Sequence, residues 1–103
     1  MTIIARLIPL LDQLEREMRT QQLWQSTPPE AKALTSTLPF AVDTLDPHEW
    51  LQWIFIPRIS LAIEQGNVPR GFSLEPYFSE AWKLHDDYLQ LLTILQQIDE
   101  VCR

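Results

Sequence analysis

The segment from residue 37 to residue 58, TLPFAVDTLDPHEWLQWIFIPR, constrains the fold of this chain more than any other stretch. Its first half is an irregular connection broken by proline. Its second half starts a helix: Asp46 suits the N-cap, Pro47 suits the first helical position, and Glu49 follows three residues after the cap. A nearly continuous run of large apolar side chains comes next. A helix that is apolar around so much of its circumference is predicted to lie centrally, with neighbours on two or more sides.

This central helix is predicted to run from Pro47 to about Gln65, because Gly66 and Asn67 are good stop residues. Pro57 falls in its middle and has no N–H to offer to the carbonyl of Trp53. The sequence therefore predicts a bend in the helix near Pro57.

A second amphipathic helix is predicted near the start of the chain, where apolar residues recur at spacings of three and four. We expect it to end near Leu23 and Trp24, before the Pro28-Pro29 pair, and to be kinked at Pro9. The apolar stripe consists of Ile4, Leu7, Leu11, Leu14 and Met18.

Residues 25–45 are predicted to form a long irregular connection, which is unusual in so small a domain. Its apolar residues suggest that it packs across the helices, and a covering role and a functional role both stay open. These residues are Leu34, Leu38, Phe40, Val42 and Leu45.

The C-terminal third predicts a connection over residues 68–75, a short helix opened by Pro76, and a last helix capped by Asp86. Apolar residues recur at helical spacing from Tyr88 to Val101. Glycines are few and strand-like alternation is weak. We therefore predict an all-α bundle of about four helices, forming one domain over residues 1–103.

Charge and cysteine content exclude several classes of function. The chain has 8 basic and 14 acidic residues, a net charge of −6, and its basic residues are scattered, which disfavours direct nucleic-acid binding. The single cysteine, Cys102, cannot form an internal disulfide and is expected in a fraying terminus. Together with the lack of a signal peptide or membrane-length apolar run, it predicts a cytoplasmic protein that does not engage a membrane.

No group of residues has the spacing of a catalytic, cofactor or metal site. His48 and His85 are far apart, no serine lies in a nucleophile elbow, and no glycine-rich loop is present. Asp43 is expected to bond nearby backbone amides or to pair with Arg58, rather than to act as a nucleophile. The sequence thus predicts a protein that is not an enzyme and needs no cofactor.

The central segment also carries a resemblance to a known family. The chain resembles the YqcC-like family of small bacterial proteins, which implies a helical bundle. Genes of that family often neighbour a tRNA pseudouridine synthase, whose name has been attached to some members by association, and no catalytic residue is established for them. The residues that match are Trp24, Ser36 to Phe40, Asp43 to Leu45, Pro47, Glu49 to Trp53, Ile56 to Arg58, and Pro76 to Phe78.

The chain has more aromatic residues than a small bundle requires, and aromatic side chains are common at protein interfaces. The leading hypothesis is a non-catalytic module that binds another protein and is linked to tRNA pseudouridine modification. Two alternatives stay open: a self-associating structural protein, and a factor that acts on RNA directly through Asp43, His48 and Arg58 converging in one cleft. The candidate partner surface comprises Trp24, Phe40, Asp43, Trp53, Arg58, Tyr77 and Phe78.

Overall fold

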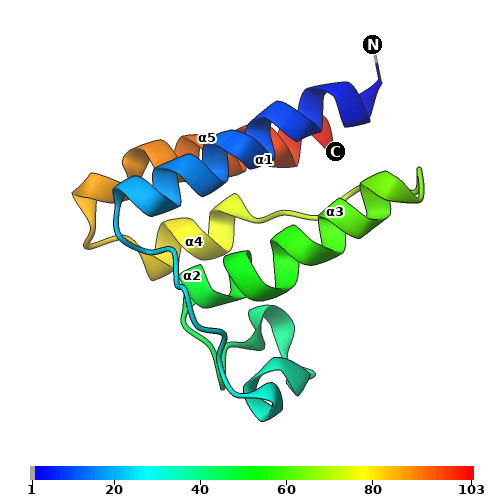
Figure 1. Ribbon diagram of the computed structural model, residues 1–103. Coiled ribbons are helices and arrows are strands. Elements are labelled where there is room, and N and C mark those ends of the chain that lie inside the picture. Colours follow the sequence, from blue (N-terminus) through cyan, green and yellow to red (C-terminus); the bar gives the residue numbers. More distant parts are fainter. Residues whose placement is uncertain (1) are drawn as a thin grey trace.

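The computed structural model describes residues 2–103, and all regular structure in this part is helical (Figure 1). The predicted all-α fold is therefore confirmed, with four helical segments. They are α1 (Ile3–Thr20), a continuous segment made of α2 (Pro47–Trp50), the π-helical turn η3 (Leu51–Phe55) and α3 (Ile56–Glu64), then α4 (Glu75–Ala81) and α5 (Leu89–Val101). Short 3₁₀ turns are η1 (Ala31–Thr35), η2 (Pro39–Ala41) and η4 (Asp86–Tyr88).

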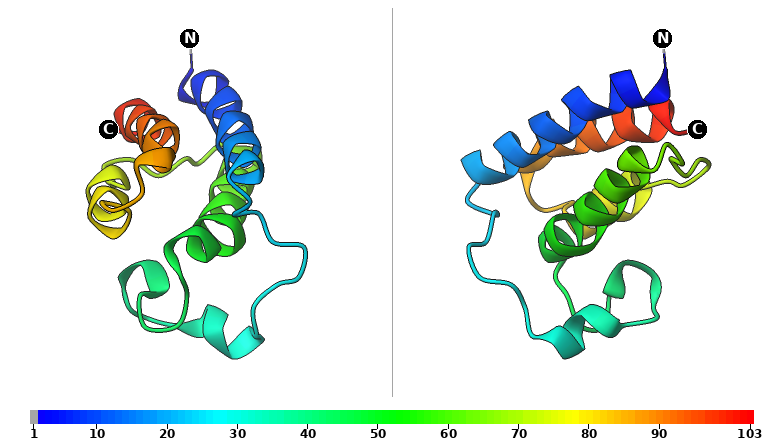
Figure 2. Two further views of the ribbon diagram at one scale, coloured as in Figure 1. Left: turned by 90° about the vertical axis from the view of Figure 1, so that its left-hand side faces the viewer. Right: turned by 45° about the vertical axis from the view of Figure 1, so that its right-hand side comes forward.

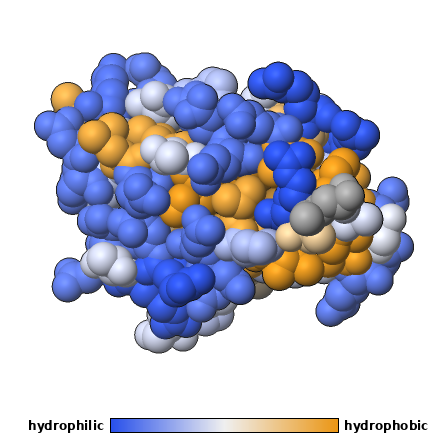
Figure 3. Space-filling view, turned by 90° about the horizontal axis from the view of Figure 1, so that it is seen from above, coloured by the Kyte–Doolittle hydropathy of each residue, from blue (hydrophilic) through white to orange (hydrophobic). Residues whose placement is uncertain are grey.

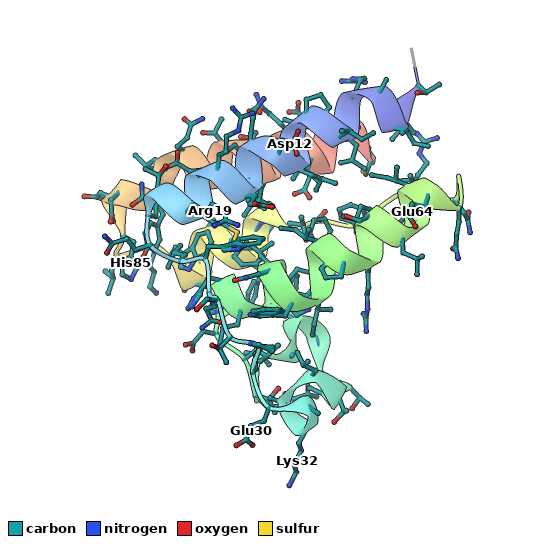
Figure 4. All side chains as sticks on the ribbon, in the orientation of Figure 1. Asp12, Arg19, Glu30, Lys32, Glu64 and His85 are labelled. Carbon is teal, nitrogen blue, oxygen red and sulfur yellow. The ribbon has the colours of Figure 1, made fainter. Side chains whose placement is uncertain are left out.

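The helices form two layers. Helices α1 and α5 lie side by side and antiparallel in one layer, while α2, α3 and α4 form the other (Figures 1 and 2). The described ends of the chain lie at the same end of the molecule. The connection over residues 21–46 projects from the second layer, on the side away from α1 and α5. Glu30 and Lys32 lie at its far tip (Figure 4).

Apolar side chains from all four segments fill the space between the layers. Leu7, Leu14 and Met18 of the predicted α1 stripe are fully buried, whereas Ile4 and Leu11 stay half-buried. Burial of each such side chain contributes roughly 1.5–3 kcal/mol. The other core members are Leu51, Phe55, Ile59, Leu74, Phe78, Trp82, Leu91, Ile94, Leu95, Ile98, Val101 and Cys102.

The C-terminal end of the chain is held by burial and hydrogen bonds, so the expectation that it frays at Cys102 is wrong. Cys102 is fully buried, and its carbonyl accepts a hydrogen bond from the Gly71 N–H at 2.7 Å. The Arg70 guanidinium donates two hydrogen bonds to the Arg103 carbonyl, at 2.8 and 3.1 Å. The connection before α4 thus holds the end of α5 in place.

Helix α1 ends at Thr20, earlier than the predicted Leu23–Trp24. Gln22 adopts the left-handed conformation (φ 61°), and the Leu23 N–H bonds to the Met18 carbonyl at 2.8 Å. This is a Schellman stop with glutamine where glycine is usual. Helix α3 ends at Glu64 in the same way, with the predicted stop residue Gly66 in the left-handed conformation (φ 67°).

The two internal prolines lie within continuous helical segments. Helix α1 begins at Ile3 and runs through Pro9 without interruption, on a side of the helix where Pro9 is exposed and water can reach the freed carbonyl. Ahead of Pro57, where a bend was predicted, the helix widens into a π turn. The Ile56 N–H bonds to the Leu51 carbonyl, five residues back, immediately before the proline that cannot donate.

Helix α4 is capped from a distant part of the chain. The Asp99 carboxylate of α5 accepts the Leu74 and Glu75 N–H groups at 2.7 and 2.9 Å. Asp86 does not cap α5 as predicted, because it lies inside the η4 turn. A carboxylate on a neighbouring helix therefore satisfies the donors that a local cap would otherwise take.

The face over α1 and α5 is mainly hydrophilic and is crossed by a band of apolar residues (Figure 3). Among the helices of residues 2–103, none combines the length and the hydropathy that a membrane span requires.

Candidate functional site

A cluster of aromatic rings joins the long connection to the helices of the second layer. The Phe40 ring stacks on Tyr77, with centroids 4.1 Å apart and planes at 3°. It meets Trp50 at 4.8 Å and the buried Phe78 at 5.9 Å, both edge to face. Such pairs add about 0.5–1.5 kcal/mol each beyond the area they bury. Phe40 thus anchors the connection to α2 and α4.

The backbone around Phe40 is strained. Phe40 and Ala41 have φ values of 58° and 49°, a left-handed conformation that costs side-chain-bearing residues about 1–3 kcal/mol each. The turn directs Phe40 towards the helices and places Ala41 in a small second core with Leu45 and Ile54. Packing of these three side chains and of the Phe40 ring offsets the strain.

An open groove with a volume of about 390 Å³ runs along this cluster. Its floor consists of the buried Phe55, Ile59 and Leu74, and its walls are the half-buried Phe40, Trp50 and Phe72. The exposed residues at its rim are Pro39, Arg58, Pro69 and Ser73.

The π turn η3 aligns two of these groove residues. Trp50 and Phe55 are five positions apart, which would place them on different faces of a regular helix. The wider turn brings their rings to 5.6 Å with planes at 25°. Phe55 in turn meets Phe72 at 5.9 Å, so the groove is continuous from α2 to the connection before α4.

The start of the long connection is held by a polar network. Gln52 is buried, with 5% of its surface exposed, and its side-chain amide bonds to both backbone groups of Gln25 at 2.8 and 2.7 Å. The Gln25 side chain accepts the Trp53 indole N–H at 2.8 Å and donates to Glu49 at 3.1 Å. Glu49 also accepts the Asp46 N–H at 2.8 Å in the predicted capping box. Both ends of the connection, at Gln25 and Asp46, are therefore bonded to the N-terminal part of the helix that carries Trp50 and Arg58.

Of the predicted surface residues, Phe40 and Arg58 line the groove together. Tyr77 lies behind Phe40 and is half-buried. Phe78 is fully buried in the core, so its assignment to a partner surface is wrong: its ring lies among Phe40, Tyr77 and Trp82.

The remaining candidates lie outside the groove. Trp24 is half-buried, with the Arg19 guanidinium 5.0 Å from its ring, and Arg19 is seen on α1 in Figure 4. Trp53 is held by Gln25, as described above.

Asp43 forms neither of the two contacts expected for it. Its carboxylate accepts the Ser36 hydroxyl at 2.5 Å, and the Ser36 oxygen accepts the Leu38 N–H at 3.1 Å. Within residues 2–103 the ion pairs are Arg19–Glu15 and Lys83–Glu80, and neither involves Arg58. Asp43 therefore stabilises a local turn, with a hydroxyl between it and the backbone amide.

The groove lining offers aromatic surface and the Arg58 cation. Asp43 and His48 are absent from the groove lining, so the three residues of the direct RNA-acting alternative do not share this cavity. Burial and the nearby Asp46 carboxylate raise the pKa of Tyr77, which keeps its hydroxyl protonated. Within the described residues, no three His, Cys, Asp or Glu side chains gather as metal ligands would.

Sequence reasoning missed Trp50, Gln52, Phe55 and Phe72 as parts of this site. Gln52 could have been found as the polar residue inside an otherwise apolar run, between two tryptophans. Phe72 had no such signal, because only the folded connection brings it to Phe55.

Comparison with known proteins identifies similar chains. The family described as "tRNA pseudouridine synthase C" matches residues 6–101. An uncharacterised protein of Haemophilus influenzae is 42% identical over 92 residues, which cover 88% of this chain and 87% of that protein. The uncharacterised protein YqcC of Escherichia coli is 35% identical over 102 residues, covering 98% of this chain and 92% of YqcC.

Two further comparisons concern a longer relative and a solved structure. A protein of Pectobacterium carotovorum named tRNA pseudouridine synthase C is 39% identical over 71 residues, which cover 68% of this chain but only 19% of that protein. The solution NMR structure of E. coli YqcC superimposes with a TM-score of 0.86 at 33% identity, covering 98% of this chain and 88% of that one.

Proposed function

The chain belongs to the YqcC-like family of helical proteins, and on that premise we propose that it is a non-catalytic accessory module that binds a tRNA pseudouridine synthase. The observation that carries this proposal is the preformed groove walled by Phe40, Trp50 and Phe72. Half-buried aromatic side chains on a rigid support are the typical anchors of protein interfaces.

The lining of the groove supports binding rather than catalysis. It offers no carboxylate, imidazole or thiol, and the hydroxyl of Ser73 has no base beside it among the lining residues. General acid–base and nucleophilic mechanisms both need such a group within hydrogen-bond reach of the reacting atom. Arg58 can attract a negative charge.

The names of the relatives support a tRNA pseudouridine synthase as the partner. The family description and the Pectobacterium protein both carry the name of a tRNA pseudouridine synthase, and most of that longer protein lies outside the matched segment. A segment similar to this chain, joined to a larger protein of that name, supports association between the two parts.

Charge supports the same partner. This chain has a net charge of −6, whereas an enzyme that binds tRNA needs cationic surface to neutralise phosphates. Complementary fields of this kind steer two proteins towards each other.

The test uses the full chain and the tRNA pseudouridine synthase of the same organism, each purified separately. Titration calorimetry and sedimentation velocity are expected to show a one-to-one complex, with a Kd on the order of 1 μM or tighter. The chain alone is expected to form no pseudouridine in unmodified tRNA. Absence of a complex at about 100 μM, far above that Kd, would overturn the proposal. Pseudouridine formation by the isolated chain would contradict its non-catalytic part.

Self-association is the second candidate. Leu84 and Leu89, at the turn between α4 and α5, are exposed to 88% and 63% and could pair across a two-fold axis. Light scattering that shows a dimer, together with no binding of the synthase, would favour this alternative. A monomer at high concentration would remove it.

A further inference from the structure

Arg58 is the one charged residue among those that line the groove. It is exposed, and its guanidinium forms no hydrogen bond or ion pair with any other part of residues 2–103. Arg19 and Arg70 differ in this respect: Arg19 pairs with Glu15 at 3.0 Å, and Arg70 bonds to the Arg103 carbonyl. Arg58 is thus an available cation at the edge of an apolar surface.

A carboxylate is the group that best matches this cation. The guanidinium presents a planar fork of donors that can hold both oxygens of a carboxylate at once. A bound apolar segment would cover part of the pair and reduce its contact with water, which strengthens the electrostatic attraction. A positively charged group in the ligand would be repelled by Arg58, and no anion in the groove lining would offset that repulsion.

The apolar part of the groove determines the size and the apolar character of the group that can bind beside the carboxylate. Its volume of about 390 Å³ lies towards the small end of the ~300–1,000 Å³ range of ligand sites. It is lined by four aromatic rings, those of Phe40, Trp50, Phe55 and Phe72. A cavity of this size and lining suits a large apolar side chain and its neighbour, rather than a whole domain surface.

We propose that the groove binds a short segment of a partner protein, in which an aromatic or leucine side chain enters the aromatic lining while a carboxylate beside it pairs with Arg58. The identity of the partner rests on the proposed function, whereas the chemistry of the segment rests on the groove alone. An RNA strand fits less well, because the lining supplies a single cation and the chain as a whole is acidic.

Two variants test the site on the full chain. Arg58→Glu reverses the charge at the rim, and its matched control, Arg16→Glu, makes the same change at an exposed arginine of α1 outside the groove lining. Ser73→Trp blocks the groove from an exposed rim position without removing a core side chain. Circular dichroism melts check that all three variants fold.

The first probe is the intact synthase. Arg58→Glu is expected to weaken binding on the order of tenfold or more, and Ser73→Trp to weaken it similarly, while Arg16→Glu changes it by less than about twofold. If wild type binds the synthase and both groove variants bind equally well, the groove inference is overturned while the proposed function stands.

The second probe is a phage-displayed library of random peptides, selected on the immobilised chain. Selected peptides are expected to share an aromatic or leucine residue next to Asp or Glu, and to lose binding to Ser73→Trp. A peptide in which that acidic residue is changed to Lys should bind Arg58→Glu better than wild type. Such peptides would support the groove chemistry even if the synthase does not bind, in which case only the proposed function fails.

Two results, one with the peptide library and one with unmodified tRNA as a further probe, would overturn the inference. One is selection of basic peptides, or of peptides indifferent to Ser73→Trp. The other is binding of unmodified tRNA that Arg58→Glu abolishes, which would assign the groove to RNA.

Discussion

The side-chain amide of Gln52 forms two reciprocal hydrogen bonds with the backbone of Gln25, in the pattern of a residue pair in an antiparallel sheet. The Gln25 N–H donates to Gln52 Oε1 at 2.8 Å, and Gln52 Nε2 donates to the Gln25 carbonyl at 2.7 Å. The two residues are 27 positions apart, and Gln52 is the buried polar side chain of the core. This pair fixes where the chain enters the long connection after α1.

Gln52→Ala is expected to lower the free energy of unfolding by about 2–3 kcal/mol. The substitution removes two hydrogen bonds and leaves the partly buried Gln25 backbone groups without their partners. Urea denaturation measures the loss. The control Gln97→Ala, on the exposed side of α5, is expected to change stability by no more than ~0.5 kcal/mol. Equal stabilities for the two variants would mean that the pair contributes nothing net.

Replacement of Phe40 should reverse the usual order of alanine and glycine. Phe40→Ala and Phe40→Gly both remove the stacked ring, but only glycine adopts φ 58° without strain. We expect Phe40→Gly to be more stable than Phe40→Ala by about 1 kcal/mol. At Gln97, inside α5, glycine should instead be less stable than alanine by about 1 kcal/mol. Thermal or urea unfolding of the four variants measures these differences in stability. If alanine is more stable than glycine at both positions, the strained turn at Phe40 is contradicted.

Asp99→Asn should destabilise the chain through helix α4. An asparagine has one side-chain oxygen to accept the two N–H groups of Leu74 and Glu75, where the carboxylate offers two. The expected loss is about 1–2 kcal/mol, in the range of a helix cap. Hydrogen exchange at the two amides should accelerate. Glu100→Gln, at the exposed neighbouring position, should leave both stability and exchange unchanged.

Stability should fall at alkaline pH in a way that depends on Cys102. Burial raises the pKa of its thiol above the ordinary value of 9.0, with a smaller contribution from the Asp99 carboxylate, while Arg70 opposes the shift. Above pH 9 the unfolded chain therefore binds fewer protons at this site than the folded one. The stabilisation is fully present below about pH 9 and is lost as the pH rises through the folded-state pKa.

The measurement compares wild type with Cys102→Ala by urea denaturation across this pH range. The cavity left by alanine lowers stability by the same amount at every pH, so only the slope reports the thiol. The variant is expected to lose less stability than wild type between neutral and alkaline pH. Parallel curves would show that Cys102 is not the titrating group.

Local patterns predicted most of the helical framework. The apolar stripe of α1, the capping box at Asp46 and Glu49, and the Gly66 stop each depend on residues within a few positions of one another. Features of this kind appear in the folded chain as predicted, because they depend only on residues close together in the sequence.

The errors all involve contacts or conformations that no local pattern reveals. Gln22 ends α1 by taking a conformation normally left to glycine, and the cap of α4 comes from Asp99, 25 positions after Leu74. The widened turn ahead of Pro57 was predicted only as a bend, since a proline shows that one hydrogen bond is lost but not how the chain compensates.

The candidate site was predictable in part for the same reason. Phe40 and Arg58 were both predicted for the candidate partner surface and line the same groove, because both belong to the segment of unusual aromatic content. Phe78 was not, because counting aromatic residues does not show which side of a short helix faces inward. Phe72 joins the groove only through the folded path of residues 68–75.

The pairing of α1 with α5 has a consequence for synthesis on the ribosome. The apolar side of α1, with Leu7, Leu14 and Met18, is covered largely by a helix that begins at Leu89. Translation at ~5–20 residues per second separates the two helices by roughly 4–14 s. During that interval the nascent chain displays an uncovered apolar stripe, so trigger-factor-like holdases that shield such stripes are expected to raise the yield of folded protein.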